Sequence, residues 1–316
     1  MVADHTQLMT PIQRLGDWDN NCLWVKREDF IPFSFGGNKA RKAQLFFLEI
    51  DAGKHDAVVT YGSSSSNHCR VVANMAAQRG IGCYIISPEE ASEETFNTNL
   101  MRLFRAEITV CPVEKVSATI DAVCNTLRGR GMNPYFIPGG GHGNTGTQAY
   151  VDCYEEIEAF EKQQSIRFDY IFLASGTGTT HAGLVCGQLI RCDDRKIVGI
   201  SIARRNPRGR DVVLESIRQY LMAKGGCFDD ATIEDATVFL DDYIGEGYGR
   251  YLDSVGKTVD IVMKKYGIPL DATYTGKAFW GMADYIEKND IRDKNILFIH
   301  TGGTPLFFDY LKSKER

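Results

Sequence analysis

The sequence lacks the features of several specialised classes of protein. Its 316 residues include nine cysteines, but these are scattered along the chain and form no Cys-x-x-Cys pair. Dispersed thiols in odd number are typical of reduced cytoplasmic proteins. We therefore expect a cytoplasmic protein with neither a disulfide framework nor a metal site built from cysteine.

Long apolar runs and an excess of positive charge are also missing. No stretch is long and apolar enough to cross a bilayer, and the first twenty residues are polar, so we expect no membrane anchor and no secretory signal. The formal net charge of −5 offers no basic surface to a polyanion. We therefore expect a soluble protein that binds neither nucleic acid nor membranes.

From Ala57 onward, short β-branched segments alternate with longer amphipathic ones, the pattern of parallel βαβ units in an α/β fold. Predicted strands cover residues 57–61, 83–86, 107–110, 134–137, 170–174, 196–202 and 295–300, and no strand is predicted before them. Predicted helices cover residues 40–52, 67–79, 95–104, 116–128, 254–266 and 277–288, and others begin after Gly143, at Thr180 and at Asp211. The length suits two lobes, and no Pro-, Gly- or Ser-rich linker separates them.

A glycine-rich run, Ser175–Gly183, follows an apolar predicted strand and leads into a predicted helix. Small residues at such a junction let backbone N–H groups approach an anion, and the helix dipole favours negative charge there. The run has neither the lysine of a Walker loop nor the spacing of a dinucleotide-binding loop. An ordinary strand-to-helix turn is the alternative interpretation.

A lysine at position 39 lies in the run Gly36–Lys42, just before a predicted helix. Burial and the neighbouring charges of Arg41 and Lys42 would lower its pKa and leave a nucleophilic amine. A solvated basic helix start is the alternative. An amine that can form an imine, combined with a loop that can hold a phosphate, is what a pyridoxal phosphate enzyme requires.

Hydroxyl-rich turns occur at three further positions. Ser63–Ser66 precede Asn67 at the start of a predicted helix, where they would either cap the helix or meet a substrate carboxylate and a cofactor oxygen. Towards the C-terminus, the runs 272–278 and 298–305 would suit a planar heterocycle, with a tyrosine to stack on the ring and a threonine to meet a ring nitrogen. Plain caps and turns would explain them equally well.

Together these runs resemble the family of D-cysteine desulfhydrase and 1-aminocyclopropane-1-carboxylate (ACC) deaminase, over nearly the whole chain from Thr10 to Gly303. The resemblance implies the two-lobed fold of tryptophan synthase β, in which each lobe is a mainly parallel sheet flanked by helices. It implies a large cofactor-binding domain of residues 1–45 and 157–316, a small domain of residues 46–156, pyridoxal 5'-phosphate as cofactor, a small amino acid as substrate, and a homodimer.

The resemblance also assigns roles to residues that match the motifs. Lys39 corresponds to the imine-forming lysine and α-proton base, and Ser66 to a substrate-facing hydroxyl. Tyr248 and Tyr274 correspond to the two active-site tyrosines, of which Tyr274 stacks on the cofactor ring. The other cofactor-binding residues implied are Asn67 at the phenolic oxygen, Gly176, Thr177, Gly178, Thr179 and Thr180 at the phosphate, and Thr301 at the pyridine nitrogen, with Thr275 as an alternative to Thr301.

Three departures from the family pattern bear on the reaction. ACC deaminases have a glutamate after the stacking tyrosine, where this chain has Thr275. A neutral hydroxyl holds a pyridinium proton less well than a carboxylate, which favours prompt loss of a β leaving group over cyclopropane opening. Ser63–Ser65 replace Gly-Ile-Gln, which leaves the substrate open, and His142 is either a substrate contact or an ordinary loop residue.

The function expected from these residues is β-elimination from a small amino acid such as D-cysteine, giving pyruvate and ammonia. Lys39 would remove the α-proton, and Tyr248, Tyr274 or Ser66 would donate a proton. The alternatives are a β-replacement synthase, an ACC deaminase and a pyridoxal phosphate-binding protein without catalytic activity.

Overall fold

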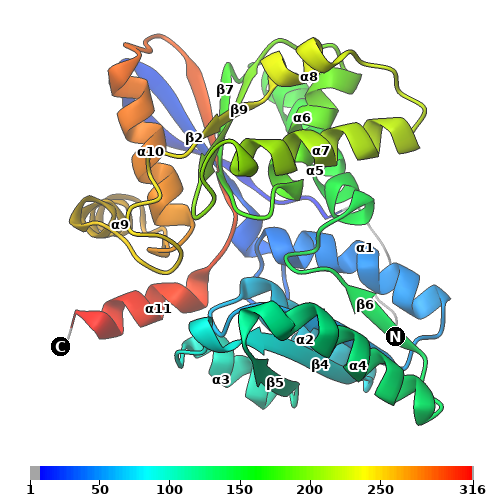
Figure 1. The fold of residues 1–316 in the computed structure, drawn as a ribbon. Coiled ribbons are helices and arrows are strands. Elements are labelled where there is room, and N and C mark those ends of the chain that lie inside the picture. Colours follow the sequence, from blue (N-terminus) through cyan, green and yellow to red (C-terminus); the bar gives the residue numbers. More distant parts are fainter. Residues whose placement is uncertain (1–7, 315–316) are drawn as a thin grey trace.

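The computed structural model describes residues 8–314, which fold into two lobes, each built around its own sheet (Figure 1). The larger sheet has the order β1-β2-β10-β7-β8-β9, and among its described strands only β1 runs antiparallel to its neighbour. The smaller sheet, β5-β4-β3-β6, is parallel throughout. This arrangement confirms the predicted α/β fold with mainly parallel sheets.

The strands of the larger sheet are β1 (Ile12–Trp18), β2 (Asn21–Arg27), β7 (Tyr170–Ser175), β8 (Lys196–Ser201), β9 (Val238–Leu240) and β10 (Asn295–His300). Those of the smaller sheet are β3 (Ala57–Tyr61), β4 (Gly82–Pro88), β5 (Glu107–Cys111) and β6 (Pro134–Ile137). The predicted strands from position 57 onward therefore agree with the structure to within two residues.

Helices α2 (Asn67–Arg79), α3 (Phe96–Leu103) and α4 (Val116–Gly129) belong to the smaller lobe. Helix α1 (Asn38–Ala52) lies between the lobes and packs on both α2 and α5 (Figure 1). The remaining α-helices are α5 (Asn144–Gln164), α6 (Thr179–Ile190), α7 (Arg208–Ala223), α8 (Asp230–Ala236), α9 (Asp253–Tyr266), α10 (Thr275–Lys288) and α11 (Thr304–Ser313).

The expectation that no strand precedes position 57 is wrong, because β1 and β2 both come earlier and complete the larger sheet. Strand β1 is a largely exposed edge strand without an apolar run, so its sequence resembles a loop. Strand β2 is held by parallel pairing with β10, some 270 residues away, which no local pattern reveals. Helices α8 and α11 and strand β9 were also not predicted.

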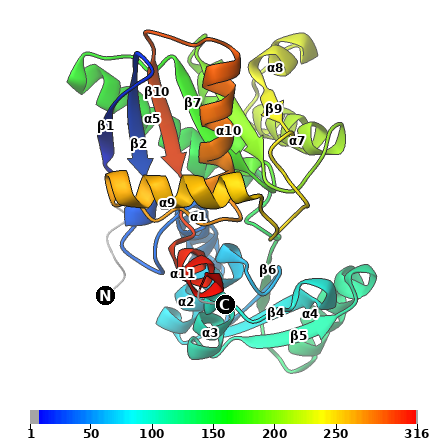
Figure 2. The same ribbon diagram turned by 90° about the vertical axis from the view of Figure 1, so that its left-hand side faces the viewer.

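The domain limits at residues 45 and 156 stay a prediction. Helices α1 and α5 run through these positions without a break, so the lobes are joined by continuous elements and not by a flexible linker. A further connection comes from α11, which lies against α3 (Figure 2). There the carboxylate of Asp309 accepts hydrogen bonds from the N–H of Phe96 at 3.1 and 3.2 Å.

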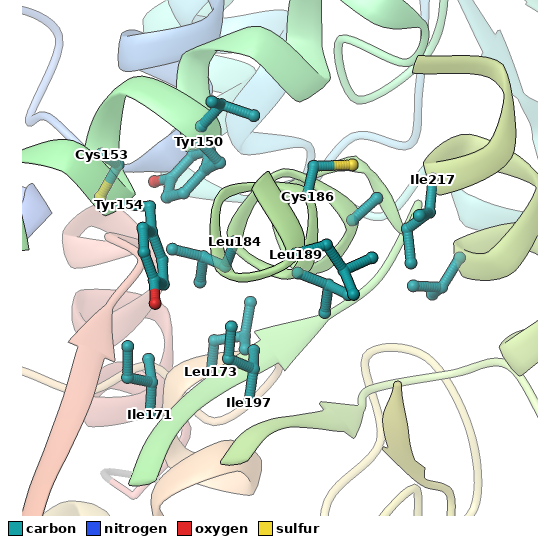
Figure 3. Packing of buried hydrophobic residues seen from close by; sticks show 14 of the residues in the cluster. Tyr150, Cys153, Tyr154, Ile171, Leu173, Leu184, Cys186, Leu189, Ile197 and Ile217 are labelled. Carbon is teal, nitrogen blue, oxygen red and sulfur yellow. The ribbon is translucent and has the colours of Figure 1, made fainter. Parts of the chain in front are cut away.

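One hydrophobic cluster of the larger lobe surrounds α6, whose apolar side chains meet those of α5, β7, β8 and α7 (Figure 3). Gly183 and Gly187 let α5 approach closely, since a Cβ atom on either would lie 2.5 Å from the Cβ of Tyr150 or Tyr154. This packing fixes the position of α6, and with it the glycine-rich loop at its N-terminus.

Within residues 8–314, no helix is long and apolar enough to span a membrane, and no cluster of His, Cys, Asp and Glu side chains could hold a metal ion. All nine cysteines lie in this range, and none forms a disulfide.

Candidate active site

Lys39 lies in the first turn of α1, which begins two residues earlier than predicted. Its Nζ atom donates a hydrogen bond to the backbone oxygen of Gly140 at 3.1 Å. Burial, together with the positive charge of Arg204, lowers the pKa of Lys39 to about 8. An amine with this pKa is far more often neutral, and hence nucleophilic, near pH 7 than an ordinary lysine.

Burial lowers this pKa as expected, but neither of the two neighbours expected to lower it, Arg41 and Lys42, is among the causes. Arg41 is instead bonded to Glu28 and Glu156 at 2.6 and 2.5 Å. The like charge near Lys39 instead comes from Arg204, which follows β8. A residue more than 160 positions away could not have been inferred from the run around Lys39.

The glycine-rich loop connects β7 to α6, as predicted. Gly178, at the N-cap of α6, has φ = +98°, a conformation that favours glycine. Two side chains of α1 reach the first turn of α6: Lys42 Nζ donates to Thr179 Oγ1 at 2.6 Å, and Asn38 Nδ2 donates to Thr180 Oγ1 at 2.9 Å. The N-terminus of α6 is thus surrounded by hydrogen-bond donors.

The polar groups of this loop match an anion. Lys42 is buried and makes no ion pair with any described residue, and burial together with Lys39 holds its pKa well below the usual value. The hydroxyls of Ser175 and Thr177 and the Nη1 atom of Arg204 are buried and have no hydrogen-bond partner among residues 8–314. Buried donors without acceptors are unfavourable, so the loop fits a phosphate group well.

Asn38, Lys42 and Arg204 were not among the predicted site residues. The spacing of Asn38 and Lys42 could have indicated them, because residues four apart on a helix share a face. The sequence gives no comparable indication for Arg204. His142, whose role was left open, lies beside the loop, where its Nδ1 atom is 3.3 Å from the backbone oxygen of Thr177.

The serine loop, Ser63–Ser66, leads into α2, and its last residue caps that helix. Ser66 Oγ accepts a hydrogen bond from the N–H of Cys69 at 3.2 Å, so the predicted helix cap is present, while its hydroxyl proton stays available. Asn67 is buried, and its Oδ1 atom accepts from Arg70 and Asn97 at 3.1 and 2.9 Å. These bonds leave its NH₂ group as the available donor.

The structure brings the two predicted tyrosines together. The hydroxyls of Tyr248 and Tyr274 form a short hydrogen bond, and their rings pack edge to face with centroids 5.9 Å apart. The Tyr248 hydroxyl also lies 3.1 Å from Ser63 Oγ and 3.3 Å from Ser65 Oγ. Burial and the adjacent Tyr248 raise the pKa of Tyr274 well above its usual value, so this phenol stays protonated.

Two threonines were candidates for the pyridine nitrogen, and they differ in their bonding. Thr275 Oγ1 donates to Asp271 Oδ2 at 2.8 Å and accepts from the N–H of Asp271 at 2.8 Å. Thr301 follows β10 and lies against the start of α1, where its backbone oxygen accepts from Asn38 N at 3.0 Å. A Cβ atom on Gly37 would lie 2.7 Å from that oxygen, so this close contact requires glycine.

Known proteins resemble this chain over nearly its whole length. Residues 4–302 match the family described as "Pyridoxal-phosphate dependent enzyme". The chain is 33% identical to a D-cysteine desulfhydrase of Yersinia enterocolitica, over 98% of this chain and 94% of that protein. It is also 33% identical to a D-cysteine desulfhydrase of Salmonella paratyphi A, over 95% and 93% of the two chains.

Solved structures of other proteins share the fold of this chain. An ACC deaminase homologue superposes with a TM-score of 0.87 at 29% identity, over 97% of this chain and 93% of that chain. O-ureido-L-serine synthase, at 18% identity and a TM-score of 0.65 over 95% and 92% of the chains, shares the fold alone.

The chain therefore belongs to the pyridoxal-phosphate dependent enzymes, in the group of D-cysteine desulfhydrase and ACC deaminase. It is a lyase that uses pyridoxal phosphate, which confirms the fold, cofactor and enzyme class expected from the sequence.

Proposed function

We propose that this enzyme catalyses β-elimination from a small amino acid with a leaving group on its β-carbon, D-cysteine or a close relative, and releases pyruvate and ammonia. Relatives named D-cysteine desulfhydrase, 33% identical over nearly the whole chain, support this choice of substrate. The local chemistry at the start of α10 supports it independently.

The observation that carries the proposal is the bonding of Asp271 and Thr275. The Asp271 carboxylate is buried and accepts hydrogen bonds from Thr275 Oγ1 and from three backbone N–H groups, those of Thr273, Tyr274 and Thr275. It therefore caps α10 and is not available to a cofactor. The positions proposed to face the pyridine nitrogen, 301 or 275, carry neutral hydroxyls, which favours loss of a β leaving group over cyclopropane opening.

We assign Thr301 to the pyridine nitrogen in preference to Thr275, whose hydroxyl is already committed to Asp271. The phosphate would be held by Gly176, Thr177, Gly178, Thr179, Thr180, Asn38 and Lys42. Asn67 would donate its NH₂ group to the phenolic oxygen, and Tyr274 would stack on the ring. Pyridoxal phosphate supplies an electron-accepting ring joined to the nitrogen of the amino acid.

The protein supplies the proton transfers. Lys39, with its pKa lowered to about 8, would be the base that removes the α-proton of the substrate. The hydrogen-bonded hydroxyls of Tyr248 and Tyr274 are the proton donors that these contacts favour. A proton lost from the Tyr248 hydroxyl can be replaced from Ser63 or Ser65. Ser66 remains the alternative donor, since its own proton is not used in capping α2.

The direct test is pyruvate formation by the enzyme loaded with pyridoxal phosphate. D- and L-cysteine and D- and L-β-chloroalanine would be supplied separately, with pyruvate followed through lactate dehydrogenase. We expect pyruvate from at least one of them and a preference for one configuration. No pyruvate from any β-substituted alanine, with the cofactor bound, would refute the proposal.

A β-replacement synthase is the second candidate, and Ser63–Ser65 favour it because they alter the loop proposed to face the substrate. Supplying a thiol or amine together with β-chloroalanine, and searching for a new amino acid by mass spectrometry, separates replacement from elimination. Ammonia release from ACC would instead identify an ACC deaminase. Cofactor absorbance that no amino acid changes would identify a protein without catalytic activity.

We also propose that the enzyme is a homodimer, as its family resemblance implies, and that it is cytoplasmic, as its dispersed cysteines indicate. Light scattering on the purified protein and cell fractionation test these two points.

A further inference from the structure

Lys277 is a buried lysine for which the proposed reaction has no use. It lies in the first turns of α10, and its side chain is inaccessible to solvent. Its Nζ atom donates three hydrogen bonds, all to backbone oxygens: Ile244 at 2.7 Å, Gly247 at 2.7 Å and Ile202 at 3.3 Å.

This arrangement is unusual for a buried cation. Buried ammonium groups are normally paired with carboxylates, as Lys26 is with Glu156 at 2.7 Å in this protein. Lys277 makes no ion pair with any described residue, and burial lowers its pKa to about 8, partly offset by Asp271. Three carbonyl oxygens converging on one positive charge resemble the coordination of a bound monovalent cation.

The three carbonyl groups come from two separate segments of the chain. Ile202 directly follows β8, whereas Ile244 and Gly247 belong to the connection between β9 and α9. The ammonium group therefore ties this connection both to the central sheet and to α10. Tyr248 is the residue that follows Gly247, so the hydrogen bond to the oxygen of Gly247 is made directly beside it.

Little else holds the chain at this point. Gly245, Gly247 and Gly249 all have positive φ, at +68°, +122° and +73°, and a Cβ atom on Gly247 or Gly249 would meet no atom within 4 Å. Tyr243 anchors the start of the connection through a bond of 2.6 Å to Asp284. Between Ile244 and Tyr251, whose ring packs against Tyr310 with centroids 5.8 Å apart, the main fixed points are the Lys277 bonds and the hydroxyl contacts of Tyr248 itself.

We propose that Lys277 is a positioning residue that acts as a built-in monovalent cation: it holds residues 244–248 so that the Tyr248 hydroxyl meets Tyr274 and the serine loop. Its effect on catalysis rests on the proposed function of Tyr248 as part of the proton-donating pair. Its effect on the conformation of the chain does not, and both can be measured.

The first experiment uses limited trypsin digestion of the cofactor-free protein. Arg250 is exposed and lies two residues beyond Tyr248, so cleavage after it reports how often this connection opens. We expect Lys277→Ala to raise the cleavage rate after Arg250 by about tenfold or more. Cleavage after Arg130, which is exposed in the smaller lobe, is the internal control and should not change.

Addition of cations makes this experiment specific. Lys277→Ala leaves room beside the three carbonyls, so K⁺, NH₄⁺ or methylammonium should slow cleavage after Arg250, whereas Lys277→Met fills the space and should not respond. Equal cleavage in wild type and Lys277→Ala would overturn the proposal, as would a rise that cations do not reverse. If Lys277→Ala does not fold, Lys277→Gln, which keeps two N–H donors without the charge, must show the faster cleavage instead.

The second experiment is a double-mutant cycle on kcat. If Lys277 acts through Tyr248, Lys277→Met and Tyr248→Phe should each lower kcat, and the double variant should be no slower than the slower single variant. Multiplied effects would mean that Lys277 acts independently and would overturn the positioning role. If the wild type forms no product, the proposed function fails, while the digestion still decides whether Lys277 holds the chain.

Discussion

The two ends of the candidate active site are built in different ways. At the cofactor end, the glycine-rich loop leads from a buried strand into α6, and Thr179, Thr180 and Lys42 are all buried. At the substrate end, Ser63 and Ser65 are partly exposed and Tyr248 is 38% exposed, on a glycine-rich connection. The cofactor end carries positive charge, whereas the substrate end presents neutral hydroxyls.

This difference indicates how each end can change. The cofactor end is part of the packed core around α6, so substitutions there should affect cofactor retention and stability together. The substrate end consists of loops positioned by that core, and loops tolerate changes that alter specificity. The substitution of Ser63–Ser65 for the usual Gly-Ile-Gln falls at this adaptable end, as expected if substrate preference varies while the cofactor is kept.

The largest expected effect is at Lys39, which serves both ends. Lys39→Ala should abolish covalent capture of pyridoxal phosphate and lower pyruvate formation by about 10³-fold or more, because the amine and the base are lost together. Borohydride reduction followed by mass spectrometry measures the capture. Lys54→Ala, on the exposed turn after α1, is the matched control. Capture at another lysine in the Lys39 variant would contradict the assignment.

At the substrate end, Tyr248→Phe and Tyr274→Phe should each lower kcat by about 10²-fold, because each removes a hydroxyl from the proton-donating pair but keeps the ring. Affinity for pyridoxal phosphate should change little, since the ring of Tyr274 can still stack. Steady-state kinetics and cofactor titration measure the two effects. Full activity in one variant would remove that tyrosine from the candidate donors, and full activity in both would leave Ser66.

At the cofactor end, Lys42→Met should affect cofactor binding more than kcat, the reverse of what we expect of the tyrosine variants. This substitution removes a charged hydrogen bond to the phosphate, which contributes about 1.5–3 kcal/mol. Cofactor binding should therefore weaken by roughly 10- to 100-fold. At saturating cofactor, kcat should change much less than in the tyrosine variants. Titration of the cofactor-free protein measures this. A large loss of kcat with unchanged affinity would place Lys42 in the chemistry instead.

The smallest expected effect is a shift in the pH dependence of covalent cofactor capture. Burial and Arg204 lower the pKa of Lys39 from 10.5 to about 8, so its neutral amine becomes abundant at lower pH than that of an ordinary lysine. Covalent capture of pyridoxal phosphate by the cofactor-free protein should therefore speed up as pH rises, reach half its maximal rate near pH 8 and level off above it. Stopped-flow absorbance measures this rate. A midpoint near pH 10 would show that Lys39 is not perturbed.

Much of the fold could be predicted because its signals are local. Alternating β-branched and amphipathic segments located every strand from β3 onward except β9, and the motif around Lys39 and the glycine-rich loop indicated the cofactor. Strands β1 and β2 were missed because one is exposed and the other depends on pairing with β10. Arg204 and the carbonyls around Lys277 were missed because their partners lie in distant segments.

By itself, the sequence determined the α/β class, the family and the cofactor, because runs such as Gly36–Lys42 and Ser175–Gly183 keep residue types and spacing within short stretches. Only the tertiary structure decided which charge lowers the pKa of Lys39, which hydroxyl is already committed to Asp271, and how Tyr248 meets Tyr274. The physical reason is that charges, hydrogen bonds and burial depend on distances in space, and chain folding sets those distances between residues far apart in sequence.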